Sequence, residues 1–404
     1  MAAANMTPAV VLGLSPTGLY AVRELGRAGV PVVGVCSEWQ TGSASRYLTA
    51  CIVEPDETRR LERLMRQFPE GSPRAVLIPT SDKDIEFIAA HADLLSARFV
   101  YQASYTQDVV HTLLTKERFY ALCEAHGVAY PKLWRCLPQE LGGLRDRIAY
   151  PCMIKPSRIH DVKGVMAGKK GWIAEDAAGF DRVVAGIPPE AGVLLLQEIV
   201  PGPESGITLF AAYRQAGGQV LQPVTGRKLR QFPPGFGSAS LVVTRPEDDS
   251  RAIAERLLSI LSYTGIAAAE FKRDPRDGAL KVIEINARPS LWFALAGAAG
   301  QKLTLAAYHD LAGTGQVLPE AGQTDGVVWR FVFKDLYSAM FYRLRPGFLL
   351  PAPDTSARRA AVRRVYAVFA ADDPAPLFAE WFQLTRKAVS RLARRAGFGG
   401  KARA

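Results

Sequence analysis

The sequence of 404 residues is poor in the residues that build disulfide frameworks, zinc sites and membrane spans. Its five cysteines are odd in number and form no CxxC pair, and its five histidines include no HExxH motif. No apolar run approaches the roughly 18 residues of a transmembrane helix. The opening MAAANMTPAV lacks the basic start and apolar stretch of a signal peptide. These absences predict a protein of the reducing cytoplasm without a disulfide framework or a structural zinc ion.

The positive charge of the chain is concentrated near its C-terminal end. The whole sequence has a net charge of +11, and residues 324–404 hold 15 lysines and arginines against 6 acidic residues. Residues 1–323 are therefore almost neutral, with a net charge of +2. We expect no nucleic-acid partner for this main body. The length and the 48% hydrophobic content fit a globular chain of two or three domains.

The start of the chain has a βαβ pattern. Ala9–Leu12 and Val30–Val35 predict strands, and Leu19–Ala28 predicts the helix between them. The loop GLSPTG resembles a phosphate-binding turn, and Glu38 follows twenty residues after Gly18, as in nicotinamide dinucleotide folds. The loop lacks the intermediate glycine of that fingerprint. An NAD(P)-dependent oxidoreductase is therefore one alternative, and a plain strand-to-helix turn in a Rossmann-like domain is the other.

Four polar residues near this turn are candidates for substrate contact. Ala75–Pro79 predicts a buried strand that runs into Thr80, Ser81 and Asp82, and open α/β sheets bind ligands beyond such strand ends. Ser15 follows the first strand and would share this edge. The alternative is that Thr80 or Ser81 only caps the next helix, because hydroxyl side chains are favoured helix caps.

Two lysines stand out in the middle of the chain. Lys116 lies within the helical stretch Val109–Gly127, and Lys155 ends the apolar strand YPCMIK. A lysine at the end of a buried strand needs a charge partner. The next segment, SRIHDVKGVMAGKKG, places Lys163 among glycines and further cations. It predicts either a polyphosphate-binding loop or a mobile cationic surface loop.

A second basic segment follows the strands predicted for Thr208–Arg214 and Gln219–Thr225. The sequence GRKLRQFPPGFGSAS combines Arg227, Lys228 and Arg230 with prolines and glycines, so we expect a loop there. Such a loop can position an anionic substrate, and it can equally be a solvated connection.

The residues with the clearest chemistry lie in a predicted β-hairpin, whose strands are Ala267–Arg273 and Leu280–Asn286. Side chains alternate along a strand, so Glu284 and Asn286 share one face, and pairing can bring Glu270 opposite them. Two acids buried together favour a hard divalent cation, and these oxygen ligands suit Mg²⁺, with Mn²⁺ as an alternative ion. Arg288 would lie on the same side and hold an anion. The other interpretation is a surface hairpin with ordinary charged positions.

Taken in order, these pieces resemble the ATP-grasp superfamily. The resemblance spans residues 9–312 and rests on the Rossmann-like start, the two lysines, the basic loop, the linker QEIVPGPES and the hairpin motif EINAR. It implies an α/β fold with a Rossmann-like pre-ATP-grasp domain at residues 1–110. A two-lobed α+β ATP-grasp domain would follow at 111–192 and 193–315, and a basic, aromatic C-terminal extension at 316–404.

The resemblance also implies roles for the residues that match its motifs. The contacts to the ATP phosphates are expected from Lys116, Lys155 and Lys163. The contacts to adenine are expected from Gln197, Glu198 and Val200, and the contact to the ribose from Glu204. The expected Mg²⁺ ligands are Glu270, Glu284 and Asn286. The cations expected to steady the transferring phosphate and the later oxyanion are Arg288 and Arg230. The loop at 157–168 is less glycine-rich than in many members, so Lys169 and Lys170 remain alternatives to Lys163.

The implied activity is the ATP-dependent ligation of a carboxylate to an amine through an acyl phosphate. The segments GRKLRQFPPGFGS, EINARPSLWF and FAADDPAPL are similar to bacterial carboxylate–amine ligases and D-aspartate ligase-like proteins, some of which act on envelope precursors. The alternatives are another ATP-grasp reaction, the NAD(P)-dependent oxidoreductase, and a nucleotide-binding protein without catalysis.

The end of the chain has a basic amphipathic pattern. From Leu384 apolar residues recur every four positions, beside a stripe formed by Lys387, Arg391 and Arg395. This pattern is typical of a helix that lies on an anionic surface, so weak membrane association through residues 384–404 is one interpretation. It would place the protein at the inner face of the membrane. The other interpretation is a solvated basic helix packed on the body.

Overall fold

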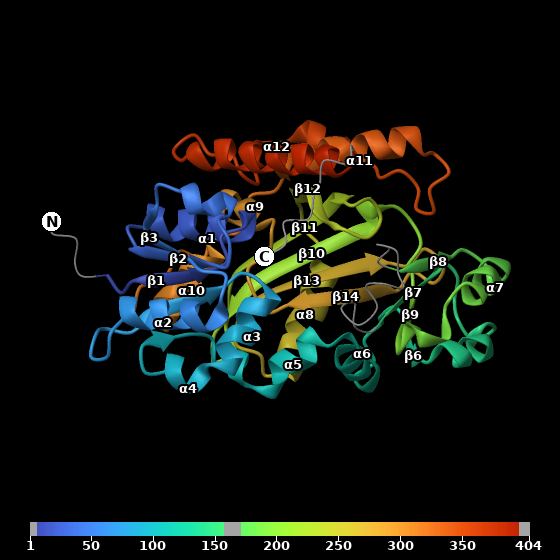
Figure 1. Ribbon diagram of the computed structural model, residues 1–404, viewed down its shortest axis with the longest axis horizontal. Helices are drawn as coiled ribbons and strands as arrows, with labels where there is room; N and C mark the ends of the chain where they lie inside the picture. Colours follow the sequence, from blue (N-terminus) through green and yellow to red (C-terminus); the bar gives the residue numbers. More distant parts are fainter. Residues whose placement is uncertain (1–5, 157–170, 396–404) are drawn as a thin grey trace.

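The computed structural model describes residues 6–156 and 171–395, without the side chains of residues 387, 388 and 390–395. The predicted basic loop with Lys163, and the side chains of the predicted C-terminal stripe, lie outside this part of the chain. Three β-sheets with helices packed on them form the described fold (Figure 1). The fold is mixed α/β, as the sequence predicts.

The first sheet is built by the N-terminal part of the chain, on the left in Figure 1. Its elements are β1 (Ala9–Leu12), α1 (Pro16–Arg27), β2 (Val32–Cys36), β3 (Leu48–Val53), α2 (Glu57–Gln67), β4 (Ala75–Pro79), α3 (Asp82–Ala90), α4 (Ala92–Leu95) and β5 (Phe99–Val100). The strands are parallel in the order β3-β2-β1-β4-β5. Every residue of β1 and β4 is buried, as expected for parallel strands with both faces covered. The predicted bounds of both strands are confirmed.

The turn between β1 and α1 is closed by its own contacts. Gly13 has a φ of +78°, which favours glycine, and a Cβ on Gly18 would come within 1.9 Å of the Gly13 carbonyl oxygen. The Thr80 hydroxyl donates to the carbonyl oxygens of Leu12 (2.8 Å) and Gly13 (3.1 Å). Tight backbone geometry therefore accounts for both glycines of GLSPTG.

The second sheet is small and antiparallel, with strands in the order β6-β9-β7-β8. Its strands are β6 (Leu133–Cys136), β7 (Cys152–Pro156), β8 (Trp172–Ala174) and β9 (Leu194–Glu198), and α7 (Ala177–Ala185) packs on it. Two helices precede this sheet, α5 (Asp108–Leu114) and α6 (Lys116–Ala125). The helical stretch predicted over 109–127 is thus divided just before Lys116, which begins α6.

The third sheet is the largest and runs diagonally through the middle of Figure 1. Its strands are β10 (Ile207–Arg214), β11 (Val220–Phe232), β12 (Ser238–Thr244), β13 (Gly265–Arg273), β14 (Leu280–Asn286), β15 (Val327–Arg330) and β16 (Arg363–Tyr366). They run in the order β14-β13-β10-β11-β12-β15-β16. The associated helices are α8 (Asp248–Ile260), α9 (Phe293–Ala298) and α10 (Leu303–Leu311). The predicted hairpin is present as β13 and β14.

The prediction of a loop over residues 226–240 is wrong for most of that segment. Strand β11 continues to Phe232 and β12 begins at Ser238, so only residues 233–237 form the turn. The cations of this segment are tolerated in a strand because each has an acidic partner. Lys228 pairs with Glu270 at 2.5 Å, Arg227 with Glu247 and Arg230 with Asp335.

The C-terminal part of the chain is integrated into the large sheet. Strand β15 pairs with β12, and β16 pairs in parallel with β15. Helix α11 (Val332–Leu344) packs on β11 and β12, and α12 (Ala375–Arg395) packs near residues 41–44 of the first domain. Both helices run along the upper edge of the molecule in Figure 1. Residues after 316 therefore complete the sheet that carries the hairpin.

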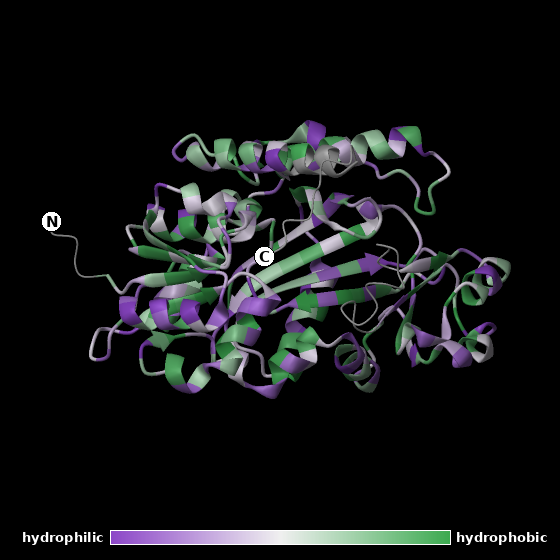
Figure 2. Cartoon of the chain, in the orientation of Figure 1, coloured by the Kyte–Doolittle hydropathy of each residue, from purple (hydrophilic) through white to green (hydrophobic). Residues whose placement is uncertain are grey.

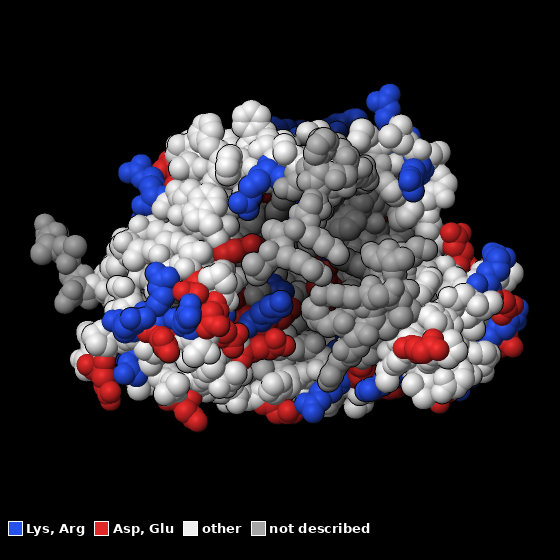
Figure 3. All heavy atoms as spheres, in the orientation of Figure 1, with Lys and Arg blue, Asp and Glu red and all other residues white. Residues whose placement is uncertain are grey.

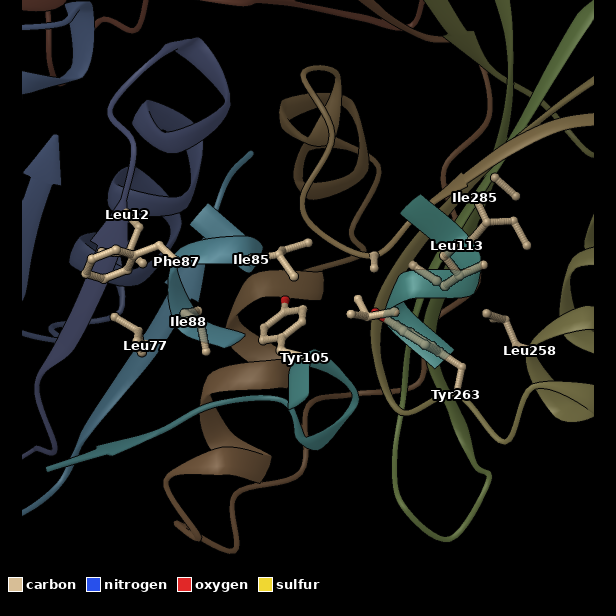
Figure 4. Close-up of a cluster of buried hydrophobic side chains, with 14 of the residues drawn as sticks. Leu12, Leu77, Ile85, Phe87, Ile88, Tyr105, Leu113, Leu258, Tyr263 and Ile285 are labelled. Carbon is tan, nitrogen blue, oxygen red and sulfur yellow. The ribbon is translucent and has the colours of Figure 1, made fainter. Parts of the chain in front are cut away.

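The main hydrophobic core joins the first sheet to the large sheet. Leu12 and Ile85 from the first sheet region belong to the same buried cluster as Tyr263 and Ile285 from the large one. Figure 4 shows Tyr105 between these two groups. Green apolar segments in Figure 2 follow the strands of both sheets. Because this core is continuous, the edge of β4 and the β13–β14 hairpin are held in a fixed relation.

Candidate active site

A cleft of about 830 Å³ lies where α6, the small sheet and the large sheet meet. Predicted residues from separate elements line it, namely Thr80, Lys116, Lys155, Gln197, Glu198, Val200, Glu270, Glu284, Asn286 and Arg288. Figure 3 shows one face of the molecule hollowed near its centre, with acidic and basic side chains beside the hollow. The fold thus brings most of the candidate residues to one place.

The acidic residues of the hairpin meet as the sequence predicts. Glu270 on β13 lies directly opposite Glu284 on β14 in the antiparallel register. Asn286 donates from Nδ2 to Glu284 Oε1 at 3.1 Å, which leaves its own amide oxygen as a further ligand. Lys116 Nζ lies 3.8 Å from Glu284 Oε2. Two carboxylates and an amide oxygen therefore converge on one wall of the cleft.

The two carboxylates differ in their electrostatics. Burial raises the pKa of Glu270, opposed by Lys228, and the neighbouring charge of Glu284 raises it further. Burial also acts to raise the pKa of Glu284, but Lys116 and the hydrogen bond from Asn286 hold it below its usual range. Two carboxylates this close, with Lys228 and Lys116 as their cationic partners, form an electrostatic setting that suits a divalent cation.

This donor set fits Mg²⁺ with an incomplete protein shell. In the described ranges 6–156 and 171–395, no group of three or more His, Cys, Asp or Glu side chains could hold a metal ion. Two carboxylates and one amide oxygen leave coordination positions for water and phosphate oxygens. This is the usual arrangement for Mg²⁺ bound together with a nucleotide.

Two lysines lie close to the acidic hairpin in the cleft. Lys155 at the end of β7 donates to Gln197 Oε1 at 3.2 Å, and Lys116 donates to the carbonyl of Ile283 at 3.4 Å. Burial, together with the nearby charge of Lys116, lowers the pKa of Lys155 to about 8. Half-buried ammonium groups with weak partners are suited to bind phosphate oxygens.

The predicted linker residues line the cleft, but the groups that they present have different partners. The carboxylate of Glu198 turns toward Arg276 and Lys281 of the hairpin turn. The carbonyl of Val200 accepts from Lys272 Nζ at 2.8 Å. The Glu198 carboxylate is therefore engaged by the hairpin turn, and the adenine contact expected of this linker stays a prediction.

Several predicted residues are not part of the cleft. Glu204 is fully buried and accepts from the backbone amides of Gln231 and Gly235. Arg230 is buried against Asp335 at 2.6 Å, and neither Arg230 nor Glu204 lines the cleft. Both side chains are thus held by contacts inside the protein, although Asp335 is shared with Arg330 and Nη2 of Arg230 has no hydrogen-bond partner among the described residues.

Of the polar residues predicted near the end of β4, some line the cleft and others do not. Thr80 lines the cleft, whereas the side chain of Ser81 caps α3, where it accepts from the Asp84 amide at 3.3 Å. Asp82 accepts from Arg288 Nε at 2.7 Å and therefore fixes that guanidinium at the rim. Ser15 stands at the start of α1 without a side-chain cap bond and does not line the cleft. The capping interpretation is confirmed for Ser81.

Sequence reasoning missed two lysines of the cleft. Lys272 lies two residues after Glu270 on the same face of β13, and this alternation was the signal that could have found it. Its Nζ donates to the carbonyls of Val200 and Gly202, both at 2.8 Å, and burial lowers its pKa to about 8. Lys334 reaches the cleft from α11, and its Nζ lies 4.2 Å from the centre of the Phe331 ring. No local sequence pattern predicts that Lys334 lies in the cleft, because its position depends on how α11 packs on the large sheet.

Comparison with curated proteins gives one relative of known activity. The chain is 29% identical over 234 residues to a D-aspartate ligase from Enterococcus faecium (strain Aus0004). The alignment covers 55% of this chain and 55% of that ligase, so the two are similar over about half of their lengths. No family model matches the sequence.

Solved structures extend the likeness to most of the chain. An L-amino acid ligase from Bacillus licheniformis has a TM-score of 0.53 at 15% identity, covering 76% of this chain and 74% of that one. The N5-carboxyaminoimidazole ribonucleotide synthetase of Thermotoga maritima has a TM-score of 0.55 at 15% identity, covering 79% and 78%. The biotin carboxylase domain of a Hydrogenobacter thermophilus carboxylase, solved with MgADP and bicarbonate, has a TM-score of 0.59 at 15% identity, covering 79% and 72%. At these identities the likeness shows the fold.

Proposed function

Since this chain has the ATP-grasp fold, we propose that it is an ATP- and Mg²⁺-dependent ligase that joins a carboxylate to an amine. The observation that carries the proposal is the cleft in which the acidic hairpin faces Lys116 and Lys155. The similarity to a D-aspartate ligase over half of the chain supports C–N bond formation. Mn²⁺ is an alternative ion for the same oxygen ligands.

The proposed chemistry follows from the poor leaving group of a carboxylate. A substrate carboxylate oxygen attacks the γ-phosphorus of ATP, the bond to ADP breaks, and an acyl phosphate forms. The amine then attacks the acyl carbon, inorganic phosphate leaves, and the amine loses a proton as the amide forms. Such phosphoryl transfer depends mainly on positioning and charge neutralisation, so no protein nucleophile is needed.

Each cleft residue has a defined part in this proposal. Glu270, Glu284 and Asn286 would hold Mg²⁺, which supplies neutralisation of phosphate charge when bound. Lys116, which lies beside Glu284, and Lys155 on β7 bind phosphate oxygens. Arg288, oriented by Asp82, steadies the transferring phosphate. Arg230 is given no part in this proposal, because it pairs with the buried Asp335 and does not line the cleft.

The domain roles belong to the same proposal. Residues 1–110, with the parallel sheet, would serve as the pre-ATP-grasp domain that presents substrate near Thr80. Residues 111–192 and 193–315 would form the two lobes, and residues 316–404 the basic extension.

We also propose a small-molecule or envelope-precursor acceptor, with the protein acting at the inner face of the membrane. The D-aspartate ligase similarity supports an amino-acid-like carboxylate donor.

The first test is the melting temperature of the purified protein with ATP–Mg²⁺, with ATP and EDTA, and with NAD(P)⁺. A ligand that binds the folded state raises the melting temperature through mass action. We expect a rise with ATP–Mg²⁺ that is lost with EDTA, followed by phosphate release when carboxylate and amine pairs are supplied. A rise with NAD(P)⁺ alone would overturn the proposal in favour of an oxidoreductase. Binding of ATP–Mg²⁺ without phosphate release across a broad substrate panel would favour a nucleotide-binding protein.

Affinity for ATP is expected to fall as the pH rises from 7 to 9. The pKa of Lys155 is lowered to about 8, so its positive charge is lost above that pH. Phosphate oxygens prefer the charged form, and each pH unit above the pKa reduces that preference by up to about tenfold. Calorimetric ATP titrations at three pH values measure the fall. The Lys155→Arg variant keeps its charge and should flatten the profile. An unchanged fall in that variant would assign the titration to Lys272 instead.

A further inference from the structure

Helix α11 exposes its apolar side chains and buries its polar ones. Phe333, Leu336, Tyr337, Met340 and Leu344 are between 45% and 70% exposed. Their spacing of i, i+3, i+4, i+7 and i+11 puts all five on one side of the helix. A surface helix normally shows the opposite arrangement, with its apolar stripe against the core.

The buried side of α11 is polar. Asp335 has no exposed surface and accepts from both Arg230 and Arg330. Ser338 is also fully buried, and its hydroxyl donates to the carbonyl of Gln231. These contacts fix the rotation of α11, so its apolar side cannot turn inward without breaking a buried ion pair.

Helix α12 repeats the same spacing. Phe378, Trp381, Phe382 and Val389 stand at i, i+3, i+4 and i+11, and each is between 61% and 65% exposed. Glu380, on the other side, accepts a hydrogen bond from Thr41 of the first domain. Helices α11 and α12 lie along the same edge of the molecule (Figure 1), and each carries an exposed apolar stripe. We call these nine side chains the apolar edge.

The segment before α12 is tied firmly to the body. Asp373 is buried and accepts from Arg23 at 2.9 Å and from Ser45 at 2.7 Å. Asp372 accepts from Arg27 and Tyr47, both at 2.7 Å. The aromatic side chains of α12 are thus presented outward by a rigid support rather than by a loose tail.

Cations outnumber acids in the sequences of α11 and α12. Asp335 and Glu380 are the only acids in the sequences of α11 and α12, and both are engaged by groups of the body. Arg343, Arg345 and Arg386 are exposed beside the stripes. The sequence of α12 continues with Lys387, Arg391, Arg394 and Arg395. Figure 3 shows this upper edge as mainly uncharged, with blue spheres at several places.

We propose that the apolar edge is a docking surface for an anionic lipid bilayer. Aromatic and aliphatic side chains would enter the interface, and the arginines would meet lipid phosphates, as in interfacial amphipathic helices. A second copy of this chain fits less well, because a twofold contact through this face would set cations of one copy against those of the other. In the described part of the chain no helix is long and apolar enough to cross a membrane, so the contact proposed is a surface contact. It differs from the tail association predicted from residues 384–404, because it rests mainly on residues 333–344 and 378–389.

The test uses the full chain and two kinds of vesicle, one of phosphatidylglycerol with phosphatidylethanolamine and one of phosphatidylcholine alone. We expect binding to the anionic vesicles that weakens as salt is raised. The double variant Trp381→Ser with Phe382→Ser should lose at least about tenfold in partition coefficient, because the interfacial contribution of two large apolar groups is removed. The matched control is Leu94→Ser, which changes a leucine that is 54% exposed on α4, away from this edge. Its binding should equal that of the unaltered protein.

A second readout reports the contact itself. Brominated lipids should quench the fluorescence of Trp381, and the Trp381→Phe variant should keep binding while losing that quenching. The proposal is overturned if the unaltered protein ignores anionic vesicles, or if the double variant binds them equally well. A dimer that the double variant abolishes, without vesicle binding, would assign the edge to a second copy. None of these outcomes depends on the ligase reaction, because lipid binding is measured without nucleotide or substrate.

Discussion

Replacing Glu284 by glutamine is expected to lower the Mg²⁺-dependent turnover of ATP by about 10³-fold. Glu284 lies opposite Glu270 and accepts from Asn286, so it is the central oxygen donor of the hairpin. An amide at this position removes one negative charge from the metal ligands and also removes the partner of Lys116. Release of phosphate from ATP with a productive carboxylate and amine pair measures the loss.

The same variant is expected to keep its fold and its melting temperature without ligand. Glu270 and Glu284 repel each other when no cation is bound, so removal of one charge relieves an unfavourable pair. A matched control is Glu255→Gln on α8, which changes only a helix-surface contact with Arg251 at 2.7 Å. Full activity in Glu284→Gln would remove the metal-ligand role. Equal losses of activity and stability would make Glu284 a structural residue instead.

The hairpin could be predicted because its chemistry is local. Alternation places Glu284 and Asn286 on one face whatever the rest of the chain does, and a short turn restricts the partners of Glu270. The buried strands β1 and β4 were predictable for the same reason, since apolar runs bounded by turn residues define them. Lys155 was singled out because it ends an apolar strand, where a lysine has no obvious place in the core, and Lys116 because its place in the order of motifs resembles that of ATP-grasp proteins.

The remaining residues could not be assigned, because their roles depend on partners far along the sequence. Glu204 resembled a cleft residue, but the fold surrounds it with the amides of Gln231 and Gly235. Arg230 resembled an anion-binding cation, but Asp335 follows 105 residues later and neutralises it. Lys334 enters the cleft from a helix that was expected to belong to a separate extension. In each case a tertiary contact decides whether a charge faces the cleft or the interior.

Replacing Glu198 by alanine is expected to destabilise the protein by about 3 kcal/mol. Glu198 lies on β9 of the small sheet and is only 4% exposed. It accepts from Lys281 at 3.0 and 3.1 Å and from Arg276, both of which belong to the large-sheet hairpin. Its loss leaves two cations with Asp274 as their remaining acidic partner. The expected loss is at the low end for buried pairs because the Arg276 side chain is 35% exposed. Denaturant unfolding at neutral pH measures the change.

Glu198, Asp274, Arg276 and Lys281 form one charged cluster between the small sheet and the hairpin. A mutation in this cluster should therefore affect stability more than a mutation of an exposed acid. Glu190→Ala changes an exposed acid shortly before β9 and should leave the stability unchanged. Glu198→Ala should also weaken ATP binding, because the cluster joins β9, which borders the cleft, to the hairpin that carries Glu270 and Glu284.

The pH dependence gives an independent check on the same cluster. Hydrogen bonds from Arg276 and Lys281 hold the pKa of Asp274 well below its usual range. A carboxyl group with a depressed pKa in the folded state adds stability above its unfolded pKa of about 4 and loses it as the pH falls further. The unaltered protein should therefore lose stability steeply below that pH. In Glu198→Ala, Asp274 alone neutralises the two cations, so the loss on acidification should be at least as steep. A flat profile between pH 5 and pH 3 in both proteins would show that the cluster does not hold the two sheets together.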